Sequence, residues 1–260
     1  MIRALHTALG ALALATTACV GTTGGDTFSF EAFGRGAGTG TVDNPSVTGL
    51  GYTLALTRAN VHVGALYLTR AARASVSSDT SCMLPGVYVA EVPFALELDA
   101  LSTERQPFPA LGQATAELAQ AGEVWLTGGD VNDASDRTVI LDVAGLAERD
   151  GTRFPFEGKL TIGENRLEPT PPELPGLKPI CKERIVSPVP VRVTPERGLA
   201  LTLTVDAARM FSNVDFSELA ADADGIYHFD DDPSTSTPAS ENLYIGLRAA
   251  SGIYTFGFEP

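Results

Sequence analysis

The fold is indicated most clearly by residues 185–205, which read IVSPVPVRVTPERGLALTLTV. Two runs of alternating residues, 185–193 and 199–205, have the period of β-strands. Residues 194–198 join them and contain a proline that presets a turn and a glycine that accepts a positive φ. The pattern therefore predicts a strand-turn-strand unit. Pro188 and Pro190 lack the amide hydrogen that a sheet ladder needs, which predicts an edge position for the first strand.

Further strands are expected on both sides of this unit, bounded by Gly, Asp or Asn clusters that turn the chain. They cover residues 26–33, 52–69, 86–98, 123–127, 138–143, 154–162 and 253–258. The long segment 52–69 suits one bent strand or a hairpin. Short helical segments are expected at residues 114–120, 206–210, 216–221 and 240–250, the last with Ser240 as its N-cap. The sequence thus predicts a mainly β fold, an antiparallel β-sandwich (immunoglobulin-like or similar) with one or two short helices in the C-terminal part.

The amino-acid composition limits the kinds of partner that the chain can bind. Its 260 residues are 44% hydrophobic, enough for a sizeable core, and 32 acidic against 18 basic side chains give a net charge of −14. Binding of a phosphate backbone requires a basic patch, so nucleic acid is excluded as a partner. We expect a single β-sandwich domain over residues 27–260, because sandwiches of this length commonly fold as one unit.

The N-terminal segment has the pattern of an export signal. Arg3 is followed by a mostly apolar stretch, 4–15, and by small residues that lead to Cys19, which predicts a signal peptide over residues 1–18. The apolar stretch is too short to span a bilayer, and no later segment comes close.

Residues 16–19, Thr-Thr-Ala-Cys, resemble the lipobox of bacterial lipoproteins, although Thr16 stands where that family usually has leucine. The resemblance implies a lipid on Cys19, a short tether over residues 19–26 and a membrane contact through the lipid. Val20 after the cysteine implies sorting to the outer membrane. Cleavage by an ordinary peptidase, with a periplasmic or secreted product, is the alternative.

The chain as a whole resembles uncharacterised bacterial surface lipoproteins whose mature part is a single β-sandwich. Outside the signal region, the resemblance rests on residues 201–206 (LTLTVD) with Met210 and Phe211 after them. It implies a location in the bacterial cell envelope.

Three cysteines are an odd number for an exported protein, in which thiols tend to pair. A lipid on Cys19 would leave Cys82 and Cys181. A disulfide between them would close a loop of about a hundred residues and stabilise the fold by roughly 4–5 kcal/mol in the chain-entropy model. Two buried free thiols are the alternative.

An acidic segment near the C-terminus is the best candidate for a metal site. Its possible ligands are five aspartates and the histidine that lies among them: Asp222, Asp224, His228, Asp230, Asp231 and Asp232. Carboxylates that converge in a flexible loop suit calcium, but the full order of an EF-hand is missing. A solvated acidic loop without a cofactor is the other interpretation.

The sequence assigns no catalytic residue, because the usual nucleophile, zinc and phosphate-loop motifs are absent. Seven aromatic residues are candidates for a carbohydrate platform, although aromatics on strands commonly pack in the core: Trp125, Tyr52, Tyr67, Tyr88, Tyr227, Tyr244 and Tyr254. We therefore expect a non-enzymatic, lipid-anchored envelope module with a structural or binding role, whose loops contact a protein, a glycan or calcium. A calcium- or metal-binding periplasmic protein is one alternative. An envelope carbohydrate-active hydrolase that uses two carboxylates is the other alternative.

Overall fold

The computed structural model describes residues 26–71, 87–127, 136–162, 184–231 and 236–260. The predicted signal peptide, Cys19, most of the tether, Cys82, Cys181 and Asp232 lie outside these ranges, so the lipidation and disulfide predictions stay predictions. Within the described residues, no helix combines the length and the apolar character that a membrane crossing requires.

The fold is mainly β and resembles a sandwich, as the alternating sequence pattern predicts. Its strands and helices are β1 (Thr27–Phe30), β2 (Ala32–Gly36), β3 (Ser46–Val47), β4 (Thr53–Val63), β5 (Ala65–Thr69), β6 (Tyr88–Val92), β7 (Leu96–Asp99), β8 (Gln106–Pro107), β9 (Gly112–Thr115), β10 (Ala119–Trp125), β11 (Val139–Arg149), β12 (Thr152–Thr161), β13 (Ile185–Val193), β14 (Ala200–Val205), the 3₁₀ helices η1 (Ala207–Phe211) and η2 (Phe216–Glu218), β15 (Tyr227–Phe229), α2 (Pro238–Leu247) and β16 (Tyr254–Glu259).

The strands form three sheets. Sheet A has the order β1-β9-β6-β5-β10-β13, and sheet B the order β16-β14-β2-β8. Sheet C has the order β15-β12-β11-β4-β3, with β7 also paired to β4. Most neighbouring strands are antiparallel, and the pairs β14–β2 and β12–β15 are parallel.

Single chain segments pass from one sheet into another, which holds the three sheets together. Residues 52–69 form a bent strand, as expected: β4 belongs to sheet C and β5 to sheet A. The bend lies at Gly64, whose amide donates a 2.7 Å hydrogen bond to the Trp125 carbonyl. In the same way β1 lies in sheet A and its continuation β2 in sheet B.

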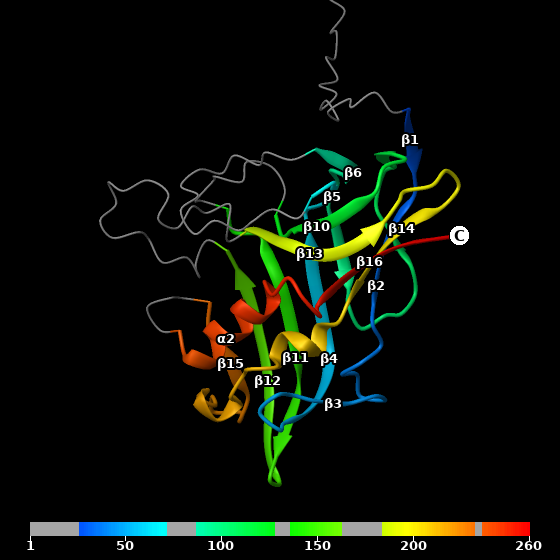
Figure 1. Cartoon of the computed structure of the whole chain (residues 1–260). Helices are drawn as coiled ribbons and strands as arrows, with labels where there is room; N and C mark the ends of the chain where they lie inside the picture. The colour runs from blue at the N-terminus through cyan, green and yellow to red at the C-terminus, as the bar shows by residue number, and fades with distance from the viewer. Residues whose placement is uncertain (1–25, 72–86, 128–135, 163–183, 232–235) are drawn as a thin grey trace, which may run out of the picture.

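The core fills the space between the sheets and under the helical segments. Sheets A and B face each other where the Phe30 ring meets the Phe258 ring edge-on, at 5.6 Å between centroids. The inner face of sheet C is covered by the helical segments, where Phe156 of β12 contacts the Phe211 and Phe216 rings. Figure 1 shows α2 and η1 in front of β11 and β12.

The strand-turn-strand unit at residues 185–205 is confirmed, but its two strands do not pair with each other. Among the described residues, β13 pairs with β10 in sheet A, whereas β14 pairs with β2 and β16 in sheet B. Residues 194–198 therefore connect two sheets and do not close a hairpin. The edge position of β13 is confirmed, and Pro188 and Pro190 are consistent with it because they cannot donate to a further strand.

The predicted helices are partly confirmed. Helix α2 begins earlier than expected, with Thr237 as its N-cap: the Thr237 side chain accepts a hydrogen bond from the Ser240 amide. Pro238 occupies the first helical turn, where its missing amide hydrogen is no loss. The helix expected at residues 114–120 is wrong, because that segment supplies the end of β9 and the start of β10.

Candidate functional site

The structure divides the predicted metal ligands of the acidic segment. Asp222 turns its own loop, since its Oδ1 accepts hydrogen bonds from the Asp224 and Ile226 amides, both at 2.9 Å. Asp231 points to β12 instead, where its carboxylate accepts from the Thr161 amide and hydroxyl. Asp230 is tied by its own amide to the Ser240 hydroxyl at 3.0 Å.

Among the described residues, no group of three or more His, Cys, Asp or Glu side chains is arranged to hold a metal ion. Of the predicted ligands, Asp222 and His228 do contact each other, at 2.8 Å between Oδ2 and Nε2. The hydrogen bond to His228 is the main reason why the pKa of Asp222 is lowered. Because Asp232 lies outside the described residues, calcium binding stays a prediction.

His228 belongs to a ladder of charges on the outer face of sheet C. Its Nδ1 lies 3.7 Å from a Glu157 oxygen on β12, and Glu157 is 3.8 Å from Arg58 of β4. Arg58 in turn donates to Asp142 of β11 at 2.8 Å. Both imidazole nitrogens therefore face carboxylates, and among the contacts of the described residues neither nitrogen faces a serine, threonine or cysteine that it could activate.

Three of the seven candidate platform aromatics do come together, on sheet A. The Tyr67 ring lies 4.7 Å from the Tyr88 ring and 4.9 Å from the Trp125 ring, between centroids. All three side chains are half-buried. They occupy β5, β6 and β10, which are neighbours in sheet A.

The other candidate aromatics lie elsewhere and pack in the core or against it. Tyr52 and Tyr227 both contact Phe154 in sheet C. Tyr254 is buried and its hydroxyl donates to the Leu247 carbonyl at 2.8 Å. Tyr244 lies under the Arg248 guanidinium.

The three clustered aromatics accompany a row of polar side chains that crosses sheet A. The strand register places the members of this row directly opposite one another, from β1 through β9, β6 and β5 to β10. The row consists of Ser29, Gln113, Glu91, Tyr67 and Glu123. Because side chains alternate between the two faces of a sheet, all five share one face. The opposite face carries Leu66 and Leu68 and belongs to the core.

The two carboxylates of this row are unusually buried. Glu91 is 8% exposed and Glu123 is 1% exposed. Trp125 donates a hydrogen bond from its indole Nε1 to Glu123 at 3.2 Å. No described residue donates a hydrogen bond to the Glu91 carboxylate, and burial raises the pKa of Glu91.

Tyr67 lies between the two acids, opposite Glu91 on one side and Glu123 on the other. Its pKa is raised, first by burial and then by the charges of Glu91 and Glu123. The row therefore combines a phenol, two carboxylates and flanking aromatic faces. Such a surface can pack against the apolar face of a ligand ring and accept hydrogen bonds from its hydroxyl groups.

The sequence interpretation missed Glu91 and Glu123. Glu91 is followed by Val92 and Glu123 by Val124, and both valines belong to the core. The available signal was therefore a single acidic residue within an apolar strand sequence. Their proximity to Tyr67 follows from strand order, which no local motif reveals.

Comparisons with protein-family models, with curated proteins and with solved structures found no match to this chain. The polar row of sheet A, with its three aromatic rings, is thus the feature of the molecule that bears most directly on function. We call Glu91, Tyr67, Tyr88, Glu123 and Trp125 the sheet A cluster.

Proposed function

We propose that this protein is an envelope-tethered binding module, and that its ligand is a carbohydrate held by the sheet A cluster. Tyr67 and Trp125 offer ring faces for the C–H side of a sugar, and the Glu91 carboxylate is an acceptor for its hydroxyl groups. Ligand sites generally combine apolar walls with a few convergent polar groups in this way.

The observation that carries the proposal is the Glu91 carboxylate. Burying a carboxyl group costs free energy unless the group gains hydrogen bonds. Glu91 is 8% exposed as a residue, but its oxygens are not among the fully buried side-chain atoms that lack a partner, so the carboxylate still reaches solvent. The described residues supply no hydrogen-bond donor to it. A hydroxyl-rich ligand would supply one.

Lipid anchoring is the second part of the proposal. Strand β1 begins at Thr27, directly after the tether predicted at residues 19–26, so the sandwich would start at its membrane attachment. We expect the protein to fractionate with membranes and to carry lipid on Cys19. The Cys19→Ser variant should be found unlipidated; an unmodified, soluble wild-type protein would contradict the anchor.

A hydrolase is the second candidate function, and the same two acids favour it. Neighbouring strands lie about 4.8 Å apart, so the backbones of Glu91 and Glu123, two strands apart, are separated by about 10 Å. Inverting glycosidases place an acid and a base carboxyl roughly 6.5–9.5 Å apart. The raised pKa of Glu91 suits the proton donor, and Glu123 would be the base.

Binding is tested by screening the mature protein against arrayed polysaccharides and measuring Kd by calorimetry for any hit. We expect Trp125→Ala to weaken binding by at least tenfold. Tyr227→Ala, which removes a half-buried aromatic side chain from sheet C, is the matched control and should leave Kd unchanged. Equal losses in both variants, or no hit, would contradict the sheet A site.

Release of reducing ends from a bound polysaccharide distinguishes the two functions. A binding module releases none, in wild type or in variants. The hydrolase is the correct function if two results are found together. The wild-type protein releases reducing ends, and the Glu91→Gln variant still binds the polysaccharide but releases none.

A further inference from the structure

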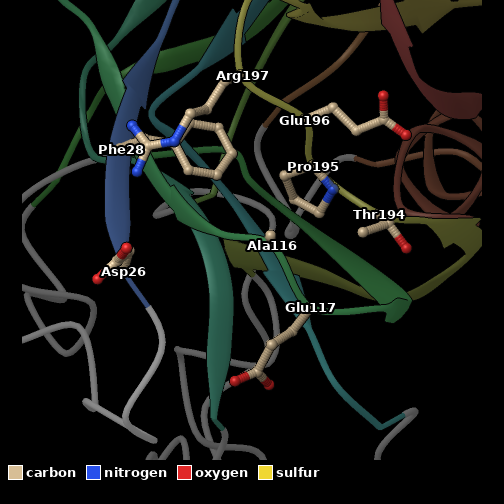
Figure 2. Close-up of a pocket in the computed structure, with 8 residues that line it drawn as sticks. All are labelled: Asp26, Phe28, Ala116, Glu117, Thr194, Pro195, Glu196 and Arg197. Atoms are coloured by element: carbon tan, nitrogen blue, oxygen red, sulfur yellow. The ribbon is translucent and has the colours of Figure 1, made fainter.

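A pocket of about 480 Å³ lies at the end of the sandwich where β1 begins, away from the sheet A cluster. Three segments that are distant in sequence form it: the start of β1, the turn between β9 and β10, and the connection between β13 and β14. Its lining, drawn in Figure 2, consists of Asp26, Phe28, Ala116, Glu117, Thr194, Pro195, Glu196 and Arg197. This volume is in the usual range of small-ligand sites.

The floor of this pocket is apolar and already carries a cation. Phe28 and Pro195 are buried, and the Arg197 guanidinium lies over the Phe28 ring, 5.0 Å from its centroid. Figure 2 shows the guanidinium in front of the ring. Arg197 itself is exposed, so only this cation–π contact holds it among the described residues, and such a contact is weak at an exposed site. An external cation can therefore compete for the ring.

Acidic side chains surround the floor. Glu117 pairs with Arg70, whereas the described residues offer no ion-pair partner to Asp26 or Glu196. Figure 2 shows the three carboxylates well apart from one another. Their separation does not suit one metal ion, but it does suit a ligand with several spaced positive charges.

We propose that this pocket binds a basic peptide segment of a partner protein, one arginine or lysine side chain of which replaces Arg197 on the Phe28 ring. A second cation of the same peptide would pair with Asp26 or Glu196. The net charge of −14 attracts such a ligand over longer distances. This site is separate from the sheet A cluster and does not depend on carbohydrate binding.

The test uses the acetylated, amidated peptide Arg-Gly-Arg, with Gln-Gly-Gln as its neutral counterpart, and follows binding to the purified protein by NMR titration. We expect saturable binding of the basic peptide alone. Affinity should fall as salt is raised, because exposed charges are screened over about 10 Å at 0.1 M ionic strength.

Two substitutions should act in opposite directions. Arg197→Gln removes the competing internal cation and should tighten binding about two- to fivefold. Glu196→Gln removes one ion pair and should weaken it by a similar factor, the size expected of an exposed pair. Both residues are exposed, so neither change threatens folding. The matched control Glu218→Gln removes the same charge at an exposed position of η2, outside the pocket lining, and should have less effect.

Binding of both peptides with equal affinity would overturn the proposal. So would a loss of affinity in Arg197→Gln, or an equal loss in Glu196→Gln and Glu218→Gln, which would show attraction to the net charge alone.

Discussion

Glu91 and Tyr67 lie directly opposite each other on β6 and β5, and neither side chain has a hydrogen-bond partner among the described residues. Glu91 is buried and Tyr67 is half-buried, and burial is the first cause of the raised pKa of each. Burial disfavours the charged form of a carboxyl group, so a folded protein that ionises Glu91 loses stability.

Replacing Glu91 with glutamine should therefore stabilise the protein at pH 8 by about 1 kcal/mol, because the amide is neutral and avoids the cost of holding a desolvated charge. The pKa of Glu91 is raised above its ordinary value of 4.5 in the folded state. The contribution of the protonated Glu91 carboxyl group to stability is thus fully present below pH 4.5 and is lost as the pH rises through the folded pKa. Urea unfolding of wild type and E91Q at pH 4 and pH 8 measures the difference, which should nearly vanish at pH 4.

Glu104 provides the control for this experiment, because it is exposed and its carboxylate has no partner among the described residues. Glu104→Gln should change the free energy of unfolding little at either pH. A destabilised E91Q at pH 8 would show that the Glu91 carboxylate has a donor, and would remove the main support for the sheet A site.

The bond from Trp125 to Glu123 gives a second prediction. Glu123 is almost fully buried, and Trp125→Phe deletes the indole N–H that donates to it while keeping most of the apolar surface. We expect a loss of roughly 1–3 kcal/mol in the free energy of unfolding. Thermal or urea unfolding measures this loss.

A double-mutant cycle attributes that loss to the bond. Glu123→Gln should cost less in the Trp125→Phe background than in wild type, because the shared interaction is already gone. Strictly additive losses would mean that the indole N–H does not stabilise Glu123.

Alternating periodicity was sufficient to predict the mainly β fold, because one buried and one outer face impose period two on every strand. It did not predict strand pairing. Residues 194–198 have the composition of a hairpin turn, yet β13 and β14 enter different sheets. Turn residues determine that the chain changes direction. Which sheet each strand joins is determined by the partner against which the strand buries its apolar face.

The candidate site was predictable only in part, for the same reason. The acidic segment at Asp222 is local in sequence and was easily found, but its carboxylates are used by nearby amides and by Thr161. Trp125, Tyr67 and Tyr88 were three of the seven aromatic residues named together as candidates for a platform, and the sequence did not single them out. Glu91 was missed, because its importance depends on lying opposite Tyr67, which is on the neighbouring strand of the sheet.

Close packing of sheet A on sheet B yields a third prediction. A Cβ atom on Gly122 of β10 would lie 2.3 Å from the Phe256 ring of β16, far inside contact distance. Phe256 is buried and its ring would have to shift, so Gly122→Ala should destabilise the protein by about 1–3 kcal/mol. Gly257→Ala in β16 is the control, since its Cβ would meet nothing closer than a Glu259 oxygen at 3.8 Å.

Thermal unfolding of the two alanine variants decides the matter. A melting temperature that falls in Gly122→Ala and stays near the wild-type value in Gly257→Ala would confirm the contact between the two sheets. Equal melting temperatures would contradict the packing of β16 against β10.

The contact between Tyr52 and Asp215 ties η2 to sheet C and gives a pH-dependent prediction. The Tyr52 hydroxyl donates to Asp215, and the Arg149 guanidinium lies 4.1 Å above the Tyr52 ring and 3.5 Å from the Asp215 carboxylate. Hydrogen bonds from Ser217 and then from Tyr52 lower the pKa of Asp215 below its ordinary 3.8. A depressed pKa means that the carboxylate stabilises the fold above pH 3.8 and that this contribution is lost as the pH falls through the folded pKa.

Asp215→Asn should therefore cost about 1 kcal/mol at pH 6, a modest value because the Asp215 side chain is partly exposed. The cost should shrink as the pH is lowered below 3.8 and through the folded pKa, where wild-type Asp215 also becomes neutral. Asp43→Asn, at an exposed position without a described partner, controls for the change in net charge. If the loss of stability in D215N did not shrink at all as the pH was lowered from 6 through the acid range, the contribution of Asp215 would come from the shape of its side chain and not from its charge.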